Sequence, residues 1–269
     1  MLATAGVDIG STTSKAVVMA DGRIVSHVIG ASSTNPSRTA EQIFDAALEQ
    51  AGIARAEIAC VVGTGYGRTR VTFADLDISE ITCHGRGASF LHPAARTVLD
   101  IGGQDTKVIS IDDQGNLLDF AMNDKCAAGT GRFLEAMARS LEMPVASMAD
   151  EYFREGLPCT ISSMCSVFAE SEVINLIHDG VPLPCIVKGL LQSLANRVSA
   201  QVRRVGVTEQ VVMTGGVAKN AGVRHALSSK LGVPVAVCAG IDPQVVGAVG
   251  AAVLAADQVM KRRGKGHML

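Results

Sequence analysis

The N-terminal quarter of the chain alternates between short apolar runs and small polar turns, a pattern typical of β-strands. Strands are predicted at residues 4–10, 15–20, 24–30 and 58–67, the last of which ends in the glycine turn GTGYG. Between them, residues 37–51 carry apolar side chains at helical spacing, with Ser37 as the candidate N-cap.

Later segments alternate helix and strand. Helices are predicted at residues 131–141, 166–178, 185–204, 219–230 and 243–259, and strands at 210–213 and 234–238. This order is typical of an α/β fold with helices on the faces of the sheet. The longest apolar run, Val245–Ala256, is well short of the roughly 20 residues that cross a bilayer, so we expect a buried helix there.

One segment of the chain occurs twice. Residues 7–19, VDIGSTTSKAVVM, align with residues 99–111, LDIGGQDTKVISI. The alignment matches Asp8 with Asp100, Ile9 with Ile101, Gly10 with Gly102 and Lys15 with Lys107. Each copy is predicted to form a β-hairpin with a small polar turn.

A repeat of this size indicates two related lobes. We assign residues 1–97 to the first lobe, with 255–269 packing back on it, and residues 98–254 to the second. The binding site is expected between the lobes, where the two hairpin turns face each other.

Composition narrows the class of protein. Apolar residues make up 48% of the 269 residues and aromatic residues only 3%, so the core must consist mainly of Ala, Val, Ile, Leu and Met. A net charge of −2 gives no bulk attraction to nucleic acid. Nothing resembles a signal peptide, because Asp8 interrupts the only early apolar run. We expect a cytoplasmic protein with neither nucleic acid nor membrane as partner. The chain has seven cysteines, and this odd number argues against a disulfide framework.

Both hairpin turns are suited to binding phosphate. Their small residues let a phosphate approach the backbone N–H groups closely. Candidate contacts are Ser11, Thr12, Thr13 and Lys15 in the first turn and Gly102, Gly103, Gln104, Asp105 and Lys107 in the second. Asp8 and Asp100 end their strands and are placed to hold the waters of a phosphate-bound Mg²⁺.

A third glycine turn lies in VVMTGGVAKN, residues 211–220. There the flat backbone of Gly215 and Gly216 suits a purine, and the following helix presents its N-terminus. Lys219 and Asn220 are further candidate contacts for the nucleotide. One such turn is weak support, but three in this order, two of them copies, indicate a nucleotide site. The chain has no Walker A pattern, so it is not a P-loop enzyme.

Two cysteines stand at predicted helix starts. Cys126 precedes one helix across the turn CAAGTG, and Cys165 directly precedes another. Helix N-termini carry partial positive charge and unpaired N–H groups, which lower the pKa of a thiol and suit an anionic iron–sulfur cluster. Two thiols are half of the four that a [4Fe–4S] cluster commonly takes, so a two-fold homodimer would supply the others.

From spacing alone, other interpretations stay open. Two buried thiols are the commoner meaning of such cysteines, and zinc is a lesser alternative, although zinc sites normally use closely spaced ligand pairs. Cys60 and Cys238 are predicted to lie in the core, in apolar strands. Pro158 and an extended segment separate Cys159 from the second helix start.

The motifs together resemble a known family. VDIGSTTSK, GTGYGR, DIGGQDTKVI, MNDKCAAGTGRFLE, SVFAESEVI and VVMTGGVAKN are similar to the motifs of 2-hydroxyacyl-CoA dehydratase activators, which share a family with the ATP-binding subunits of benzoyl-CoA reductase. The resemblance implies the two-lobed, actin-like (ribonuclease H-like) ATPase fold of the actin, Hsp70 and sugar kinase superfamily. It also implies a homodimer with one [4Fe–4S] cluster held by Cys126 and Cys165 of both subunits.

The implied activity is transfer of single electrons at low potential, driven by hydrolysis of ATP to ADP. The donor would be ferredoxin or flavodoxin and the acceptor an iron–sulfur dehydratase or reductase, while Gln104 would position the attacking water. Many relatives carry Thr where this chain has Met164. The acceptor stays open between several dehydratases, a benzoyl-CoA reductase and other double-cluster reductases. A small-molecule kinase of the same fold, with Asp105 as the base, is the second alternative.

Overall fold

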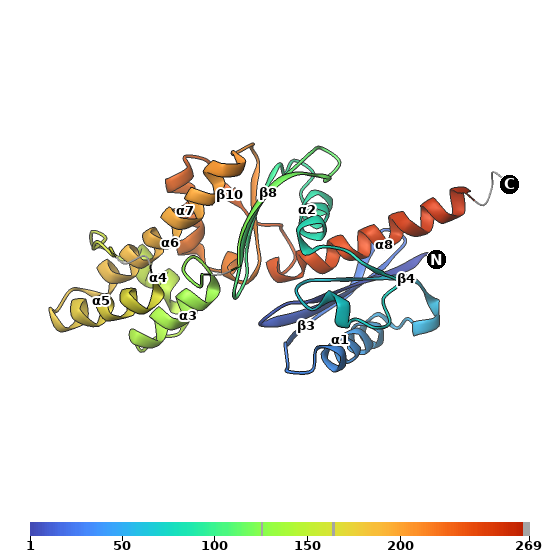
Figure 1. Cartoon of the computed structure of the whole chain (residues 1–269), viewed down its shortest axis with the longest axis horizontal. Helices are drawn as coiled ribbons and strands as arrows, with labels where there is room; N and C mark the ends of the chain where they lie inside the picture. Colours follow the sequence, from blue (N-terminus) through green and yellow to red (C-terminus); the bar gives the residue numbers. More distant parts are fainter. Residues whose placement is uncertain (125, 163–164, 266–269) are drawn as a thin grey trace. The chain divides into compact units, whose positions relative to one another are not determined.

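The computed structural model describes residues 1–124, 126–162 and 165–265 (Figure 1). This part of the chain divides into two compact units. Unit 1 comprises Met1–Arg96, Ile111–Leu118 and the chain from Cys238 on, and unit 2 comprises Thr97–Ser110 and Asp119–Val237.

Unit 1 is built on a five-stranded sheet in the order β3-β2-β1-β4-β5. Its strands are β1 (Ala3–Ile9), β2 (Thr13–Ala20), β3 (Arg23–Ala31), β4 (Ile58–Thr64) and β5 (Leu76–Asp77). The first three are antiparallel neighbours, while β4 runs parallel to β1 and β5 parallel to β4.

Alternate side chains of this sheet are buried on opposite faces, as strand geometry requires. Val7 and Val18 pack with helix α1 (Pro36–Ala51), whereas Val17 packs with helix α8 (Val246–Lys265). On the α8 face, Thr4 Oγ1 donates to the carbonyl of Ala252 at 3.1 Å. Both faces of the sheet are therefore covered, which is why its strands are almost continuously apolar.

Helix α8 belongs to unit 1, which corrects the predicted boundary. The prediction placed 98–254 in the second lobe, but residues 238–254 lie in unit 1 because α8 packs on β1 and on helix α2 (Glu80–Leu91). Small residues make this close packing possible: a Cβ on Gly6 would collide with the backbone of α8, and one on Gly87 would collide with the carbonyl of Val246.

The stretch Pro243–Arg263 is long and apolar enough to span a membrane by length and composition alone. In the structure 61% of its apolar window is buried, so it has the character expected of a core helix. This agrees with the prediction of a buried helix at Val245–Ala256, where Val245, Val249 and Ala252 are fully buried.

Unit 2 is built on a second five-stranded sheet in the order β10-β9-β6-β7-β8. Its strands are β6 (Thr97–Ile101), β7 (Thr106–Ile111), β8 (Leu117–Asn123), β9 (Val211–Thr214) and β10 (Val235–Ala236). Its helices are α3 (Gly131–Ser140), α4 (Met148–Phe153), α5 (Ser166–His178), α6 (Leu183–Val205) and α7 (Ala221–Leu231). Leu190, Leu194 and Val198 of α6 are fully or almost fully buried in the core of this unit.

Short 3₁₀ turns complete the described elements: η1 (Arg55–Glu57), η2 (Arg68–Arg70), η3 (Val145–Ser147), η4 (Gly216–Lys219) and η5 (Pro243–Val245). One cap differs from the prediction. Helix α1 is capped by Asn35, whose side chain accepts from Arg38 N at 3.1 Å, with Pro36 at the first helical position, so Ser37 lies inside the first turn.

The predicted repeat is confirmed in the strand register. Asp8 pairs with Lys15 across β1 and β2, and Asp100 pairs with Lys107 across β6 and β7. The duplication extends further than the prediction, because a parallel strand flanks each hairpin: Asp8 pairs with Thr64 of β4, and Asp100 pairs with Thr214 of β9.

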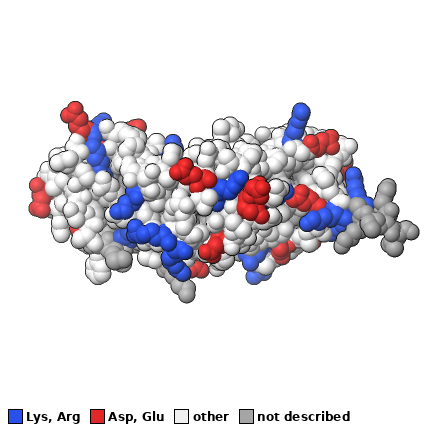
Figure 2. All heavy atoms as spheres, turned by 90° about the horizontal axis from the view of Figure 1, so that it is seen from above, with Lys and Arg blue, Asp and Glu red and all other residues white. Residues whose placement is uncertain are grey.

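Surface charge is mixed in sign. Figure 2 shows basic and acidic side chains interspersed on the face that it presents, with much of that face uncharged. The distribution agrees with the small net charge of −2.

Candidate functional site

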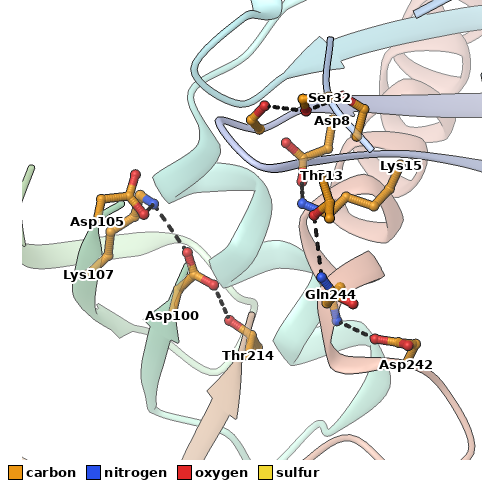
Figure 3. A network of polar contacts seen from close by, with 12 residues as sticks. Asp8, Thr13, Lys15, Ser32, Asp100, Asp105, Lys107, Thr214, Asp242 and Gln244 are labelled. Atoms are coloured by element: carbon orange, nitrogen blue, oxygen red, sulfur yellow. Dashed lines mark hydrogen bonds and ion pairs between the residues drawn. The ribbon is translucent and has the colours of Figure 1, made fainter. Parts of the chain in front are cut away.

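The first hairpin of unit 1 holds a buried ion pair. Asp8 is 4% exposed, and Lys15 Nζ donates to its Oδ2 at 3.2 Å (Figure 3). The two residues face each other in the register, so their side chains emerge on the same side of the sheet. The turn closes when Gly10 N donates to Thr13 O at 3.2 Å.

A polar group in this turn is available to a ligand. Among the described residues, Thr12 Oγ1 is buried without a hydrogen-bond partner. Buried polar groups normally have a partner, so this hydroxyl is free to bind a water or a phosphate oxygen. Ser11 is exposed, and Thr13 Oγ1 accepts from Gln244 Nε2 at 3.3 Å.

Three further segments meet Asp8. Gly65 has a φ of +86°, and a Cβ there would collide with Asp8 Oδ1. Gly67 N donates to Ile9 O at 2.8 Å, which fastens the GTGYG turn to the end of β1. A Cβ on Gly247 would lie 2.8 Å from His84 Nε2 and 3.3 Å from Asp8 Oδ2, so the buried imidazole and the carboxylate flank the same glycine.

Nothing in the sequence pattern singled out His84 or Gln244. His84 is carried by α2, a helix whose glycines hide its periodicity, and Gln244 lies in η5 just before α8. Asp242 Oδ1 accepts from Gln244 N at 2.9 Å and so fixes that turn. The GTGYG turn, in contrast, was predicted from the sequence. A Thr-Gly pair follows an apolar strand both at Thr64 and at Thr214.

The second hairpin, in unit 2, holds a denser network (Figure 3). Lys107 Nζ lies 3.2 Å from Asp100 Oδ2 and 2.8 Å from Asp105 Oδ1, and its side chain is only 4% exposed. Thr214 Oγ1 donates to Asp100 Oδ1 at 3.0 Å. A buried cation between two carboxylates is neutralised in place. Lys107, which was predicted as a phosphate contact, lies between Asp100 and Asp105.

The turn of the second hairpin is joined to the segment that follows Cys126. The carbonyls of Gly102 and Gly103 accept from Gly131 N and Arg132 N, each at 2.9 Å. Gly131 and Arg132 begin α3, so the turn satisfies N–H groups that the helix itself leaves unpaired. Thr106 Oγ1 also donates to Gly129 O at 2.7 Å. Gln104, at the tip, is exposed.

The third glycine turn follows β9. Gly215 has a φ of +84°, and a Cβ there would lie 2.8 Å from Asp100 Oδ1, so this turn repeats the contact of Gly65 with Asp8. Helix α7 begins at Ala221 rather than at 219, because Asn220 Oδ1 accepts from Val223 N at 3.1 Å and caps it. The Asn220 side chain therefore has a structural task, while Lys219 is exposed.

The two predicted cluster ligands are exposed and stand before helices. Cys165 is the N-cap of α5, and its carbonyl accepts from Ala169 N at 2.9 Å. Cys126 lies ahead of α3, and Asn123 Nδ2 donates to its carbonyl at 3.0 Å. Met164, which borders the second ligand in sequence, lies outside the described residues.

The core cysteines differ chemically from this pair. Cys60, Cys83 and Cys238 are buried, as predicted for the first and third, although Cys238 follows β10 rather than lying in a strand. Burial raises the pKa of Cys83 to about 12 and that of Cys238 to about 11. These thiols stay protonated at neutral pH and are poor nucleophiles and ligands.

The Arg197 guanidinium interacts electrostatically with both exposed thiols. The Arg197 side chain of α6 lies over the Phe133 ring, with 5.4 Å from its guanidinium carbon to the ring centroid. Burial lowers the pKa of Arg197, and the charges of Cys126 and Cys165 act on that pKa in the opposite direction. Two exposed thiols beside one cation are a donor set that suits an anionic cluster.

One chain nevertheless offers only part of a cluster site. In the described ranges, no group of three or more His, Cys, Asp or Glu side chains is placed to hold a metal ion. The two thiols fit a [4Fe–4S] cluster only if further ligands come from elsewhere.

Known proteins are similar to this chain in sequence. The sequence model of the BadF/BadG/BcrA/BcrD ATPase family matches residues 5–255. The activator of lactoyl-CoA dehydratase from Anaerotignum propionicum is 48% identical over 265 residues, which cover 96% of this chain and 99% of that protein.

Solved structures agree with the fold. The activator of the 2-hydroxyisocaproyl-CoA dehydratase from Clostridium difficile, with bound ADPNP, is 44% identical, with a TM-score of 0.89 and 98% of each chain covered. A ROK family glucokinase from Streptomyces griseus is 17% identical, with a TM-score of 0.60 over 95% of this chain and 99% of that one. The predicted actin-like fold is confirmed, and the glucokinase supports the fold alone.

Proposed function

Because this chain belongs to the BadF/BadG/BcrA/BcrD ATPase family, we propose that it is the ATP-hydrolysing activator of a 2-hydroxyacyl-CoA dehydratase. In this proposal it passes single electrons at low potential from a [4Fe–4S] cluster to that iron–sulfur enzyme. The observation that carries the proposal is the direct hydrogen bonding between the second phosphate turn and the segment of the first cluster cysteine, at Gly102–Gly131 and Thr106–Gly129.

Nucleotide binding is assigned to the two hairpins and the third turn. Backbone N–H groups of both hairpin turns, with the hydroxyls of Ser11, Thr12 and Thr13, would contact the phosphates of ATP or ADP. Asp8 and Asp100 would hold the waters of a bound Mg²⁺, which supplies charge neutralisation at the phosphates. Lys15 would reach a phosphate, Lys107 would keep Asp100 and Asp105 in place, and Gly215 and Gly216 would lie against the adenosine. Lys219, which is exposed in that turn, would also contact the nucleotide, and Asn220 would hold the start of α7.

Gln104 is assigned to orienting the attacking water. It is exposed at the tip of the second turn, between Gly103 and Asp105. A side-chain amide can both accept from water and donate to phosphate, which suits this role.

We expect Gln104→Ala to bind ATP normally but to hydrolyse it about 10²-fold more slowly, because positioning of the nucleophile contributes at this scale. Isothermal titration with a non-hydrolysable analogue and a phosphate-release assay measure the two properties. Gln114→Ala, which removes an exposed side-chain amide outside the phosphate turns, is the matched control. An unchanged hydrolysis rate would remove Gln104 from the mechanism.

The cluster is assigned to Cys126 and Cys165 of two copies of the chain. Helix α5 supports a dimer here, because Val167 and Phe168, directly after Cys165, are 66% and 67% exposed. Large apolar side chains exposed together mark interaction surfaces, and a second copy would cover them. When bound, the cluster supplies one-electron redox chemistry; the helix N-termini and Arg197 would stabilise its negative charge.

Coupling is assigned to the hydrogen bonds between the second turn and α3. A nucleotide can act on the cluster only if its binding free energy differs between two conformations of the protein. Contacts at Gly102, Gly103 and Thr106 would transmit such a difference, because the same turn would meet the phosphates through its N–H groups and hold the segment after Cys126 through its carbonyls and the Thr106 hydroxyl.

We expect Thr106→Val to retain iron and nucleotide binding, while ATP-dependent electron transfer to the partner enzyme becomes about tenfold slower. The valine keeps the shape of the buried side chain but removes the donor to Gly129 O, a loss of ~1–2 kcal/mol. Midpoint potentials of the cluster with ADP and with a non-hydrolysable ATP analogue test this, since the difference between them should shrink. Ser110→Ala, on the same strand, is the control; an undiminished difference in Thr106→Val would contradict the coupling.

A small-molecule kinase is less well supported. Its proposed base, Asp105, is paired with Lys107 at 2.8 Å, which leaves it poorly placed to accept a proton from a substrate hydroxyl.

The electron donor in our proposal is ferredoxin or flavodoxin, and the site of action is the cytoplasm.

The proposal is tested by anaerobic reconstitution. Protein purified without oxygen should be brown, contain iron and sulfide, and activate a 2-hydroxyacyl-CoA dehydratase only with Mg·ATP and a low-potential reductant. Activation that needs no ATP, or colourless protein with full activity, would overturn it. Co-purification with an iron–sulfur reductase in place of a dehydratase would redirect the proposal to that acceptor.

A further inference from the structure

Two cysteines outside the proposed cluster site lie side by side in unit 2. Cys159 lies in the extended segment after α4, and Cys185 lies in the first turn of α6. Cys159 N donates to Cys185 O at 3.0 Å. Fixed backbone bond lengths then place the two Cα atoms within about 7 Å of each other, which is the upper range for a disulfide.

Both side chains lie in the space between these two segments. Cys159 Sγ is 3.0 Å from the position that a Cβ on Gly189 would take, one helical turn after Cys185. Cys185 Sγ is 2.9 Å from the corresponding position on Gly156, three residues before Cys159. Each sulfur therefore packs against the backbone of the other segment, and the absence of a Cβ at both glycines leaves room for it.

The thiols also interact electrostatically and can be reached. Burial raises the pKa of Cys159, and Cys185 and Glu172 raise it further. Both cysteines are free and only partly buried, in contrast to Cys60, Cys83 and Cys238. Reactivity of a thiol pair requires proximity and access.

We propose that Cys159 and Cys185 form a reversible disulfide by exchange with a small-molecule or protein disulfide. One thiolate attacks a sulfur of the incoming disulfide and forms a mixed disulfide with that half of the reagent, while the other half leaves as a thiol. The second protein thiol loses its proton and attacks the protein sulfur of the mixed disulfide, and the half of the reagent that was bound leaves as a second thiol. The protein thiols lose two electrons and two protons in total, and the reagent gains them.

The bond would tie the segment before Cys165 to α6. Cys159 lies six residues ahead of Cys165 in the chain. Oxidation would thereby restrict the loop that carries a proposed cluster ligand. The proposal goes beyond the activator function and does not rest on it, because the thiol pair reacts whether or not the chain carries a cluster.

Peptide mapping tests the proposal on the full-length protein. The protein is incubated without oxygen with an excess of glutathione disulfide, free thiols are blocked with iodoacetamide, and the chain is digested. Trypsin releases residues 155–188 as one peptide that holds Cys159, Cys165 and Cys185. Further cleavage after Met164 and at Glu170 and Glu172 separates the three thiols, so the linked pair is identified by mass.

We expect the Cys159 and Cys185 peptides to be joined by a bond that dithiothreitol removes. In Cys159→Ser and Cys185→Ser the remaining thiol should instead be alkylated or carry one glutathione, whereas Cys238→Ser, which changes a buried thiol of unit 1, should keep the link. A bond from Cys165 to either residue, or complete alkylation of both wild-type thiols, would overturn the proposal. The wild-type map decides this even where a variant fails to fold.

Discussion

Replacing Cys126 or Cys165 by serine should remove all bound iron while leaving ATP binding intact. A serine hydroxyl has nearly the shape of the thiol but is not an anion at neutral pH, so it cannot replace a thiolate ligand. The phosphate hairpins do not depend on either thiol for their hydrogen bonds. Iron and sulfide analysis of anaerobically purified variants, with nucleotide titration in parallel, measures both properties.

The controls are substitutions of two cysteines outside the proposed cluster site. Cys238→Ala and Cys159→Ser should keep full iron, because the first thiol is buried with a raised pKa and the second lies before the α5 start. Loss of the cluster should also weaken the dimer, since a ligand that binds only the assembled form stabilises it. Full iron in Cys165→Ser would exclude this residue as a ligand.

The nucleotide hairpins could be predicted from the sequence because their chemistry is local. The spacing from Asp8 to Lys15 recurs from Asp100 to Lys107, and a two-strand register follows from alternation alone. The exposed cysteines could be found because a cap position is a local feature as well, as at Cys165.

Tertiary contacts decided the parts that the sequence analysis missed. Helix α2 contains Gly85 and Gly87, which lower intrinsic helix propensity, and close packing against α8 overrides that cost. For the same reason the α8 segment joins unit 1, although it follows unit 2 in the chain. His84 could not be assigned to the surroundings of Asp8 without these two packed helices.

The ion network of the second hairpin was also outside what the sequence could predict. Register places Lys107 opposite Asp100, but nothing in the spacing says that Asp105 turns back to the same ammonium. This network is the more buried of the two. The Lys107 side chain is 4% exposed, against 12% for Lys15 in the first hairpin.

We therefore expect Asp100→Asn to lower both stability and ATP hydrolysis. Removing one carboxylate from a buried pair costs about 3–5 kcal/mol, and the remaining pairing of Lys107 with Asp105 puts this case near the lower end, at about 3 kcal/mol. Hydrolysis should fall by roughly a hundredfold or more, because a misplaced metal-bound water costs at least that. Denaturant unfolding and phosphate release measure the two effects.

Asp8→Asn separates the structural role from the catalytic one. It makes the equivalent change in the first hairpin, where the Lys15 side chain is 12% exposed against 4% for Lys107, so the loss of stability should be smaller, at about 2 kcal/mol. Both carboxylates are proposed to hold waters of the same Mg²⁺, so hydrolysis should fall comparably in the two variants. Equal losses of stability would show that burial of Lys107 does not set the cost, and full hydrolysis in either variant would remove that carboxylate from the metal site.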